Sequence, residues 1–89
     1  MVRDKLESAA DALARASDAA GGDAADRLSD LSNQLETLST RDRAPDHGRL
    51  ARIQNALGDL REGADADVAE AIDDADDAID AFRETIEGV

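Results

Sequence analysis

The sequence predicts an all-α protein, an antiparallel up-down-up-down four-helix bundle that forms a single domain over residues 1–89. Aliphatic residues recur in alternating steps of three and four along four stretches, which is the spacing of one face of a helix. Glycine or proline interrupts the pattern between the stretches. The connections are short, and short connections force consecutive helices to run antiparallel. A homodimer of open helical hairpins would present the same apolar stripes and is the alternative architecture.

The first helix is expected over residues 2–20 and the second over residues 23–40. Gly21 and Gly22 separate them, because glycine is the usual residue just past a helix C-terminus, and Asp23 is placed to cap the second helix. Alanine fills half of the apolar positions in the first helix, so we expect it to approach its neighbours closely and to contribute least to the core. The apolar positions are Val2, Leu6, Ala9, Leu13, Ala16 and Ala20 in the first helix and Ala24, Leu28, Leu31, Leu35 and Leu38 in the second.

The third helix is expected over residues 46–62. Pro45 disfavours a helical conformation in the residue before it, so the helix begins after the proline with Asp46 as its cap. Gly48 and Gly58 fall near or within this helix, and an interior glycine costs about 1 kcal/mol relative to alanine. The helical pattern is therefore weakest here. The apolar positions are Leu50, Ile53, Leu57, Leu60 and Ala64.

The fourth helix is expected over residues 67–87, where Asp67 followed by Glu70 resembles a capping box. Its apolar positions are Val68, Ile72, Ala75, Ile79, Phe82 and Ile86. The densest acidic cluster of the chain lies between them and consists of Asp73, Asp74, Asp76, Asp77 and Asp80. Bundles that bind two metals project Glu and Glu-x-x-His residues inward, and no such pair occurs in this sequence. We therefore expect a solvated acidic face and no metal site.

The charge balance is strongly acidic and unusual in the kinds of residue that it uses. Twenty-two acidic residues face ten basic ones, for a net charge of -12. Sixteen of the acidic residues are Asp, and nine of the ten basic residues are Arg. Self-repulsion at this charge density destabilises a compact chain in dilute buffer, and molar salt relieves it. The composition therefore indicates a halophilic cytoplasm, with an acidic mesophilic protein as the alternative.

Several classes of function are disfavoured by what the sequence lacks. The absence of cysteine excludes disulfides, thiolate metal sites and thiol catalysis. No apolar run approaches the ~18 residues that a membrane span needs. We expect a soluble cytoplasmic protein that has no cofactor and is not an enzyme.

The central run RDRAPDHGRLAR, residues 41–52, is the one long stretch with a positive balance. Its arginines could neutralise carboxylates and helix C-termini at the same end of the bundle, which is a structural role. They could instead bind the phosphates of nucleic acid or another anion, although the acidic surroundings and the lack of exposed aromatic residues weigh against nucleic acid. A protein partner is the third alternative. The candidate interaction residues are Arg41, Arg43, His47, Arg49 and Arg52.

His47 is the only histidine and follows Asp46, as a general base follows its orienting carboxylate in some enzymes. The sequence offers no nucleophile in a recognisable setting beside it. A histidine in the first turn of a helix is most often exposed or packed against the neighbouring connection. We therefore assign no catalytic residue.

The run RDRAPDHGRLAR and the tail FRETIEGV, residues 82–89, resemble a family of small haloarchaeal proteins of about ninety residues with no assigned function. The resemblance implies an intracellular haloarchaeal protein and brings no activity, ligand or catalytic residue. The preferred hypothesis is a noncatalytic module that binds a protein partner or itself. The alternative is a small protein that binds an anion or nucleic acid at the Arg41–Arg52 end, although an aliphatic core thinned by alanine leaves little room for a ligand cavity of ~300 Å³.

Overall fold

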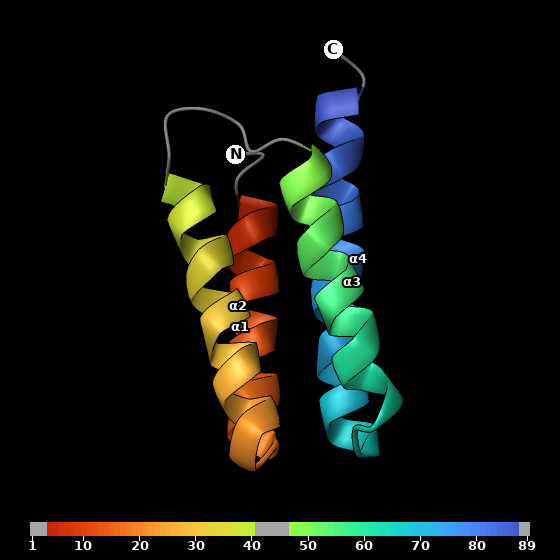
Figure 1. Cartoon of the computed structure of the whole chain (residues 1–89). Coiled ribbons are helices and arrows are strands. Elements are labelled where there is room, and N and C mark those ends of the chain that lie inside the picture. Colours follow the sequence, from red (N-terminus) through yellow and green to blue (C-terminus); the bar gives the residue numbers. More distant parts are fainter. Residues whose placement is uncertain (1–3, 41–46, 88–89) are drawn as a thin grey trace.

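The computed structural model describes residues 4–40 and 47–87, which form four helices and no strand (Figure 1). The helices are α1 (Asp4–Ala19), α2 (Gly22–Thr40), α3 (His47–Glu62) and α4 (Ala66–Glu87). Consecutive helices run in opposite directions, with both glycine-containing turns at one end of the molecule. The predicted all-α up-down-up-down bundle is confirmed, with helix ends within two residues of the expected ones in the described part of the chain.

The helix starts differ slightly from the predicted caps. Gly22 adopts a left-handed φ of 60° and is the first residue of α2, so Asp23 lies inside the first turn and not at the cap. The α4 helix begins before Asp67, and the Ala69 amide donates to the Asp65 carbonyl at 2.9 Å. Asp65 therefore occupies the position that the sequence assigned to Asp67. Both aspartates still favour the helix because a negative charge in the first turn complements its dipole.

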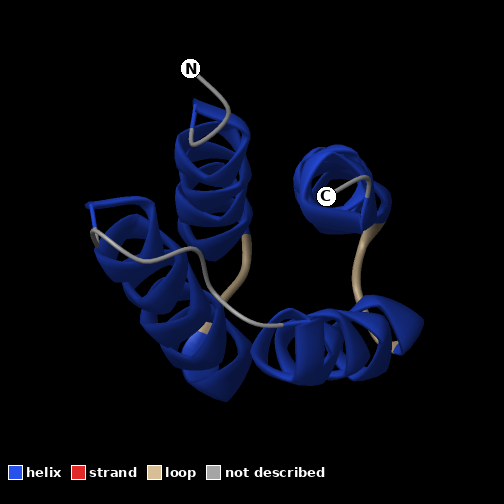
Figure 2. Ribbon diagram, turned by 90° about the horizontal axis from the view of Figure 1, so that it is seen from above, coloured by secondary structure: helices blue, strands red, loops and turns tan. Residues whose placement is uncertain are grey.

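The helices surround one shared interior (Figure 2). They do not approach one another equally. Among the described residues, α1 packs closely against both α2 and α4, whereas α3 packs less closely against α4. The α2 and α3 helices make the fewest close approaches of the neighbouring pairs. The bundle is therefore closed around α1 and open between α2 and α3. We call the surface between the α2 and α3 helices the α2–α3 side.

The apolar stripes expected from the sequence form the core as far as their residues are described. Val2 and the side chain of Ile86 lie outside the described part of the chain. Phe82 and the leucines and isoleucines at the centre of each helix are almost completely buried. Leu60, Ala20, Ala24 and Ala64 are only half-buried, and they lie toward the glycine-turn end. The fully buried large side chains are Phe82, Leu6, Leu13, Leu28, Leu35, Leu38, Leu50, Leu57, Ile72 and Ile79.

The expectation that the first helix contributes least to the core is wrong. Six residues of α1 are buried, but only three residues of α3 are. The small alanine side chains let α1 approach two neighbours at once, so Ala10 and Ala12 are buried as well as the predicted positions from Leu6 to Ala16. Ser32 of α2 is also buried in this contact, and its hydroxyl donates to the Ala10 carbonyl at 2.7 Å. Ser17 of α1 donates in the other direction, to the α2 backbone, at 2.8 Å.

No helix in the described part of the chain is both long and apolar enough to cross a membrane.

Candidate functional site

The candidate interaction residues are only partly placed by the structure. Arg41 and Arg43 lie outside the described residues, as does the predicted cap Asp46. The other candidates, His47, Arg49 and Arg52, lie on the first two turns of α3. His47 and Arg49 are half-buried, and Arg52 is exposed.

His47 is bound to the neighbouring helix. Arg83 of α4 donates from Nε to His47 Nδ1 at 3.1 Å and from Nη1 to Gln54 Oε1 at 2.7 Å. A ring nitrogen that accepts a hydrogen bond carries no proton, so the neutral imidazole holds its proton on Nε2. His47 Nδ1, the nitrogen that could accept a proton as a general base, already accepts a hydrogen bond from the Arg83 guanidinium.

Gln54 continues this set of contacts along the helix pair. Its Nε2 donates to Asp76 Oδ1 at 2.9 Å and to Asp80 Oδ1 at 2.8 Å. We call the five residues His47, Arg83, Gln54, Asp76 and Asp80 the α3–α4 polar network. It joins α3 to α4 through long side chains, so it holds the two helices together while keeping their axes apart.

The acidic cluster of α4 is only partly the solvated face that the sequence predicts. Asp73 forms a two-pronged ion pair with Arg61, at 2.6 Å from Nε to Oδ1 and 2.9 Å from Nη2 to Oδ2. Asp74 Oδ2 lies 3.7 Å from Nη2 of Arg15 in α1, and both of these side chains are largely exposed. The hydrogen bond and charge of Arg61 lower the pKa of Asp73.

Asp76 has the opposite electrostatic setting one turn further along α4. Its carboxylate is half-buried, and this loss of hydration raises its pKa. The hydrogen bond from Gln54 partly offsets the effect, while the charges of Asp80, Asp77 and Asp73 add to it. The pKa of Asp73 is thus shifted below the ordinary aspartate value and the pKa of Asp76 above it.

Sequence reasoning missed Gln54 and Arg83, which are the centre of the polar network. One signal could have found them: His47, Gln54 and Arg61 are spaced one heptad apart, beside the apolar stripe of α3. Each of these residues contacts α4. Arg83 is the only basic residue after Arg61, so it was the natural partner at the far end.

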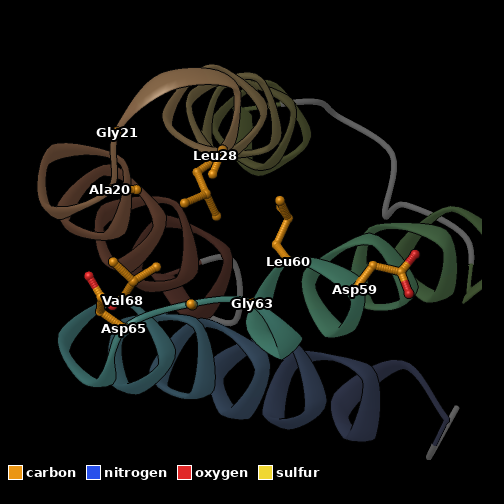
Figure 3. A pocket seen from close by; sticks show the side chains of 10 residues that line it. Ala20, Gly21, Leu28, Asp59, Leu60, Gly63, Asp65 and Val68 are labelled. Atoms are coloured by element: carbon orange, nitrogen blue, oxygen red, sulfur yellow. The ribbon is translucent and has the colours of Figure 1, made fainter.

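A cavity of about 310 Å³ lies at the glycine-turn end of the molecule, where the two hairpins meet (Figure 3). We call it the turn-end cavity. Leu28 of α2 and Leu60 of α3 point toward one another across it, and Val68 of α4 lies to one side. Its aliphatic lining consists of Ala20, Ala24, Leu28, Leu60, Ala64 and Val68.

The rest of the lining of the turn-end cavity consists of glycine and aspartate residues. Gly21 and Gly63 line it, and a Cβ added at either position would meet nothing within 4 Å. The charged residues of the lining are Asp59 and Asp65, and the Asp59 carboxylate is directed away from Leu60. This part of the molecule contains open space, apolar surface and negative charge together.

A second hollow of about 180 Å³ continues along the α2–α3 side. It lies between Leu31 and Gln34 of α2 and Ala56 of α3, with Arg27 and Asp30 beside it. The expectation that the alanine-thinned core leaves little room for a cavity is therefore wrong. Space remains because α2 and α3 do not close on each other, and the larger hollow lies at the opposite end from His47.

Within residues 4–40 and 47–87, no group of three His, Cys, Asp or Glu side chains is arranged to hold a metal ion.

Comparison with known sequences places the chain in a family. Residues 1–85 match a family described as a family of unknown function, DUF7553. The chain belongs to DUF7553. No curated protein and no solved structure matches it. Membership in DUF7553 confirms the resemblance to a family without an assigned function and adds no activity or ligand.

Proposed function

We propose that this protein is a noncatalytic helical module that binds a partner protein through its α2–α3 side. The open α2–α3 side is the observation that carries the proposal. Two hollows follow it, and Leu60 is left half-buried there, although the other neighbouring helix pairs approach one another more closely. A half-open hollow with an aliphatic lining can receive a buried anchor residue of a partner protein.

A noncatalytic role is supported by how the chemically versatile side chains are used. His47 Nδ1 and the Arg83 guanidinium are bound to each other, and Gln54 links Arg83 to two aspartates. These contacts tie α3 to α4. They give His47, Arg83 and Gln54 a structural role between the helices.

We further propose that the protein works in the salt-rich cytoplasm of a haloarchaeon. The acidic residues whose burial is described are all exposed except Asp73 and Asp76, and they lie on all four helices. Salt at about 1 M shortens the Debye length to ~3 Å, so most repulsion between these carboxylates is removed. Hydrophobic contacts on the α2–α3 side keep their strength under the same conditions, because salt does not screen them.

The salt proposal is tested by far-UV circular dichroism between about 20 mM and about 2 M KCl. We expect the helical signal to be partly lost at the low concentration and restored at the high one. A chain that is fully helical in both buffers would contradict adaptation to high salt.

The binding proposal is tested by affinity capture from a haloarchaeal lysate in about 2 M KCl, with matched baits. The baits are the wild type, the α2–α3 side variant Leu60→Gln, the arginine pair Arg49→Gln with Arg52→Gln, and the control pair Asp11→Asn with Asp18→Asn on the exposed face of α1. We expect partners that the wild type and the α1 control retain and that Leu60→Gln loses.

Each purified partner is then titrated against the same four proteins. Loss of binding with the arginine pair alone would move the contact to the Arg41–Arg52 end and contradict the α2–α3 side. Retention of a nucleic acid and no protein would support the anion-binding alternative, and no specific retention by the wild type would overturn the proposed function.

A further inference from the structure

The turn-end cavity has a chemistry that selects a particular kind of partner segment. Its floor is aliphatic. Leu60 is half-buried there, and Leu28 and Val68 are buried beneath the open space. At about 310 Å³ it is at the lower end of the size of ligand pockets, about 300 to 1,000 Å³, and it has room for a large aliphatic side chain. The cavity therefore offers an anchor point for an aliphatic residue.

The charge around the cavity is negative from two independent sources. Asp59 and Asp65 are the charged residues of its lining, and no basic residue is among the residues that line it. The α1 and α3 helices also end here, and helix C-termini carry partial negative charge. The last turn of α1 contains no basic residue, and the one basic residue in the last turn of α3, Arg61, is paired with Asp73.

The helix starts at the same end do not reverse this balance. The α2 and α4 helices begin here with partial positive charge. Each has an aspartate in its first turn, Asp23 in α2 and Asp67 in α4, which neutralises that charge. A complementary partner must therefore place positive charge next to its aliphatic anchor.

We propose that the turn-end cavity binds an aliphatic side chain of a partner protein that is flanked by basic residues, an inference that rests on the proposed function. Burial of the aliphatic side chain supplies the affinity, and this term persists in high salt. The basic neighbours supply selectivity at short range, and their effect weakens as salt screens the aspartates.

The direct test is an NMR titration of the ¹⁵N-labelled protein with acetylated and amidated tripeptides. The probes are lysine-leucine-lysine, lysine-alanine-lysine and glutamate-leucine-glutamate, each in two KCl concentrations at which the protein is folded. We expect lysine-leucine-lysine to bind most tightly and to shift the amides of Gly21, Leu28, Leu60 and Gly63. Replacing its leucine by alanine should weaken binding about tenfold, the discrimination usual for lost apolar contacts.

The two salt concentrations separate the two contributions. The preference for lysine-leucine-lysine over glutamate-leucine-glutamate should shrink as KCl rises, while its preference over lysine-alanine-lysine should not. The double variant Asp59→Asn with Asp65→Asn should remove most of the preference over glutamate-leucine-glutamate and leave the preference over lysine-alanine-lysine. Asparagine is a favourable cap residue, so the change at position 65 should not disturb the start of α4.

Two matched variants test the location. Gly63→Met fills the cavity, because a Cβ at this position meets nothing within 4 Å, and we expect it to weaken lysine-leucine-lysine binding tenfold or more. Gly58→Met adds the same side chain to open space on the exposed face of α3 and should leave binding unchanged. If Gly63→Met does not fold, Leu60→Gln replaces it, because Leu60 is half-buried and a polar side chain is tolerated there.

Any of the following results would overturn the inference. The leucine and alanine peptides could bind equally tightly, or both cavity variants could bind lysine-leucine-lysine as the wild type does. The chemical-shift changes could be confined to another surface, or hexylammonium ion could saturate the same amides although no peptide binds. Sedimentation that shows a dimer lost in Gly63→Met, with no peptide binding, would assign the cavity to a second copy of the chain and overturn it too.

The outcomes keep the inference separate from the proposed function. If the wild type captures a partner that Gly63→Met also captures, the cavity assignment fails and the proposed function stands. If the wild type captures no partner, the proposed function fails, and binding of lysine-leucine-lysine then has no physiological meaning even when it occurs.

Discussion

The α1 and α3 helices have the same length, 16 residues, and opposite places in the bundle. The α1 helix is rich in alanine and packs closely against two neighbours, while α3 carries larger aliphatic residues and packs less closely against one. The size of the side chains on a stripe therefore does not by itself measure what a helix contributes to the core. The distance at which the backbones meet matters as much.

The reason lies in what fills the contact between the helices. Around α1 the spacing is set by alanines and by the Ser32 hydroxyl, which bonds directly to the α1 backbone. Between α3 and α4 it is set by Gln54, Arg83 and Arg61, which reach across a wider gap to their partners. The wide spacing of α3 also leaves the α2–α3 side open and creates the two hollows.

The largest effect is expected from truncating one buried leucine in each of the two helices. Leu13 and Leu57 are both almost completely buried, and Leu→Ala changes in a core cost about 2 to 5 kcal/mol. The cost rises with the cavity that remains, and α3 can move inward more easily than α1 can. We therefore expect Leu13→Ala near the upper end and Leu57→Ala near the lower end, measured by urea unfolding in high salt. A larger loss for Leu57→Ala would contradict the central place of α1.

A smaller effect is expected from adding volume at matched alanines. Ala9 is completely buried against its neighbours, so Ala9→Leu should destabilise the protein by about 1 to 3 kcal/mol. Ala56 is half-buried and lines the 180 Å³ hollow, so Ala56→Leu should leave stability unchanged or raise it. Thermal unfolding of the two variants checks this, and similar losses for both would show that the α2–α3 side is as tightly filled as the α1 contacts.

The glycines of the two hairpins give a third, smaller contrast. Gly58 is an exposed residue within α3, and an added Cβ meets nothing within 4 Å, so Gly58→Ala should stabilise the protein by about 1 kcal/mol. Gly22 has a left-handed φ of 60°, so Gly22→Ala should destabilise it by about 1 to 2 kcal/mol. The urea midpoints of the two variants should move in opposite directions. A stabilising Gly22→Ala would refute the turn geometry between α1 and α2.

The smallest expected effects come from the aspartates at the α3–α4 contact, and they differ in sign. The pKa of Asp73 is lowered, so its stabilisation is complete above the pKa of the unfolded chain and is lost as pH falls through the folded pKa. The pKa of Asp76 is raised, so its ionised form destabilises the fold, and this penalty disappears as pH falls. At neutral pH, Asp73→Asn should lower stability slightly and Asp76→Asn should raise it. Changes of the same sign in unfolding curves between pH 3 and pH 7, a window that spans the ordinary aspartate pKa of about 4, would contradict these settings.

Most of the fold could be predicted from the sequence, because aliphatic periodicity and glycine turns act locally. Leu28, Ile53 and Phe82 are buried as their spacing requires. The close approach of α1 to its neighbours was predicted from its alanines and is confirmed, but the wider spacing of α3 was not predicted, because it depends on contacts between residues of different helices. Spacing along one helix shows which face is apolar and does not show how near the partner helix comes.

The candidate site was harder to predict for a related reason. The sequence drew attention to an unusual local composition, the arginines of residues 41–52, of which Arg41 and Arg43 lie outside the described residues. The α3–α4 polar network and the turn-end cavity are instead made by residues far apart in the chain, such as Gln54 with Arg83 and Leu28 with Leu60. The heptad spacing of His47, Gln54 and Arg61 marks the α3 side of the network, but the sequence does not show which residues of other helices these contacts reach.

Native-state hydrogen exchange, followed amide by amide by NMR in high salt, tests most directly whether the bundle is closed around α1 and open beside α3. The amides of residues 9–16 in α1 should exchange only through global unfolding, so their opening free energy should equal the stability measured with urea. The amides of residues 50–57 in α3 should exchange through a smaller opening, with a clearly lower free energy. Equal protection of the two helices would contradict the account.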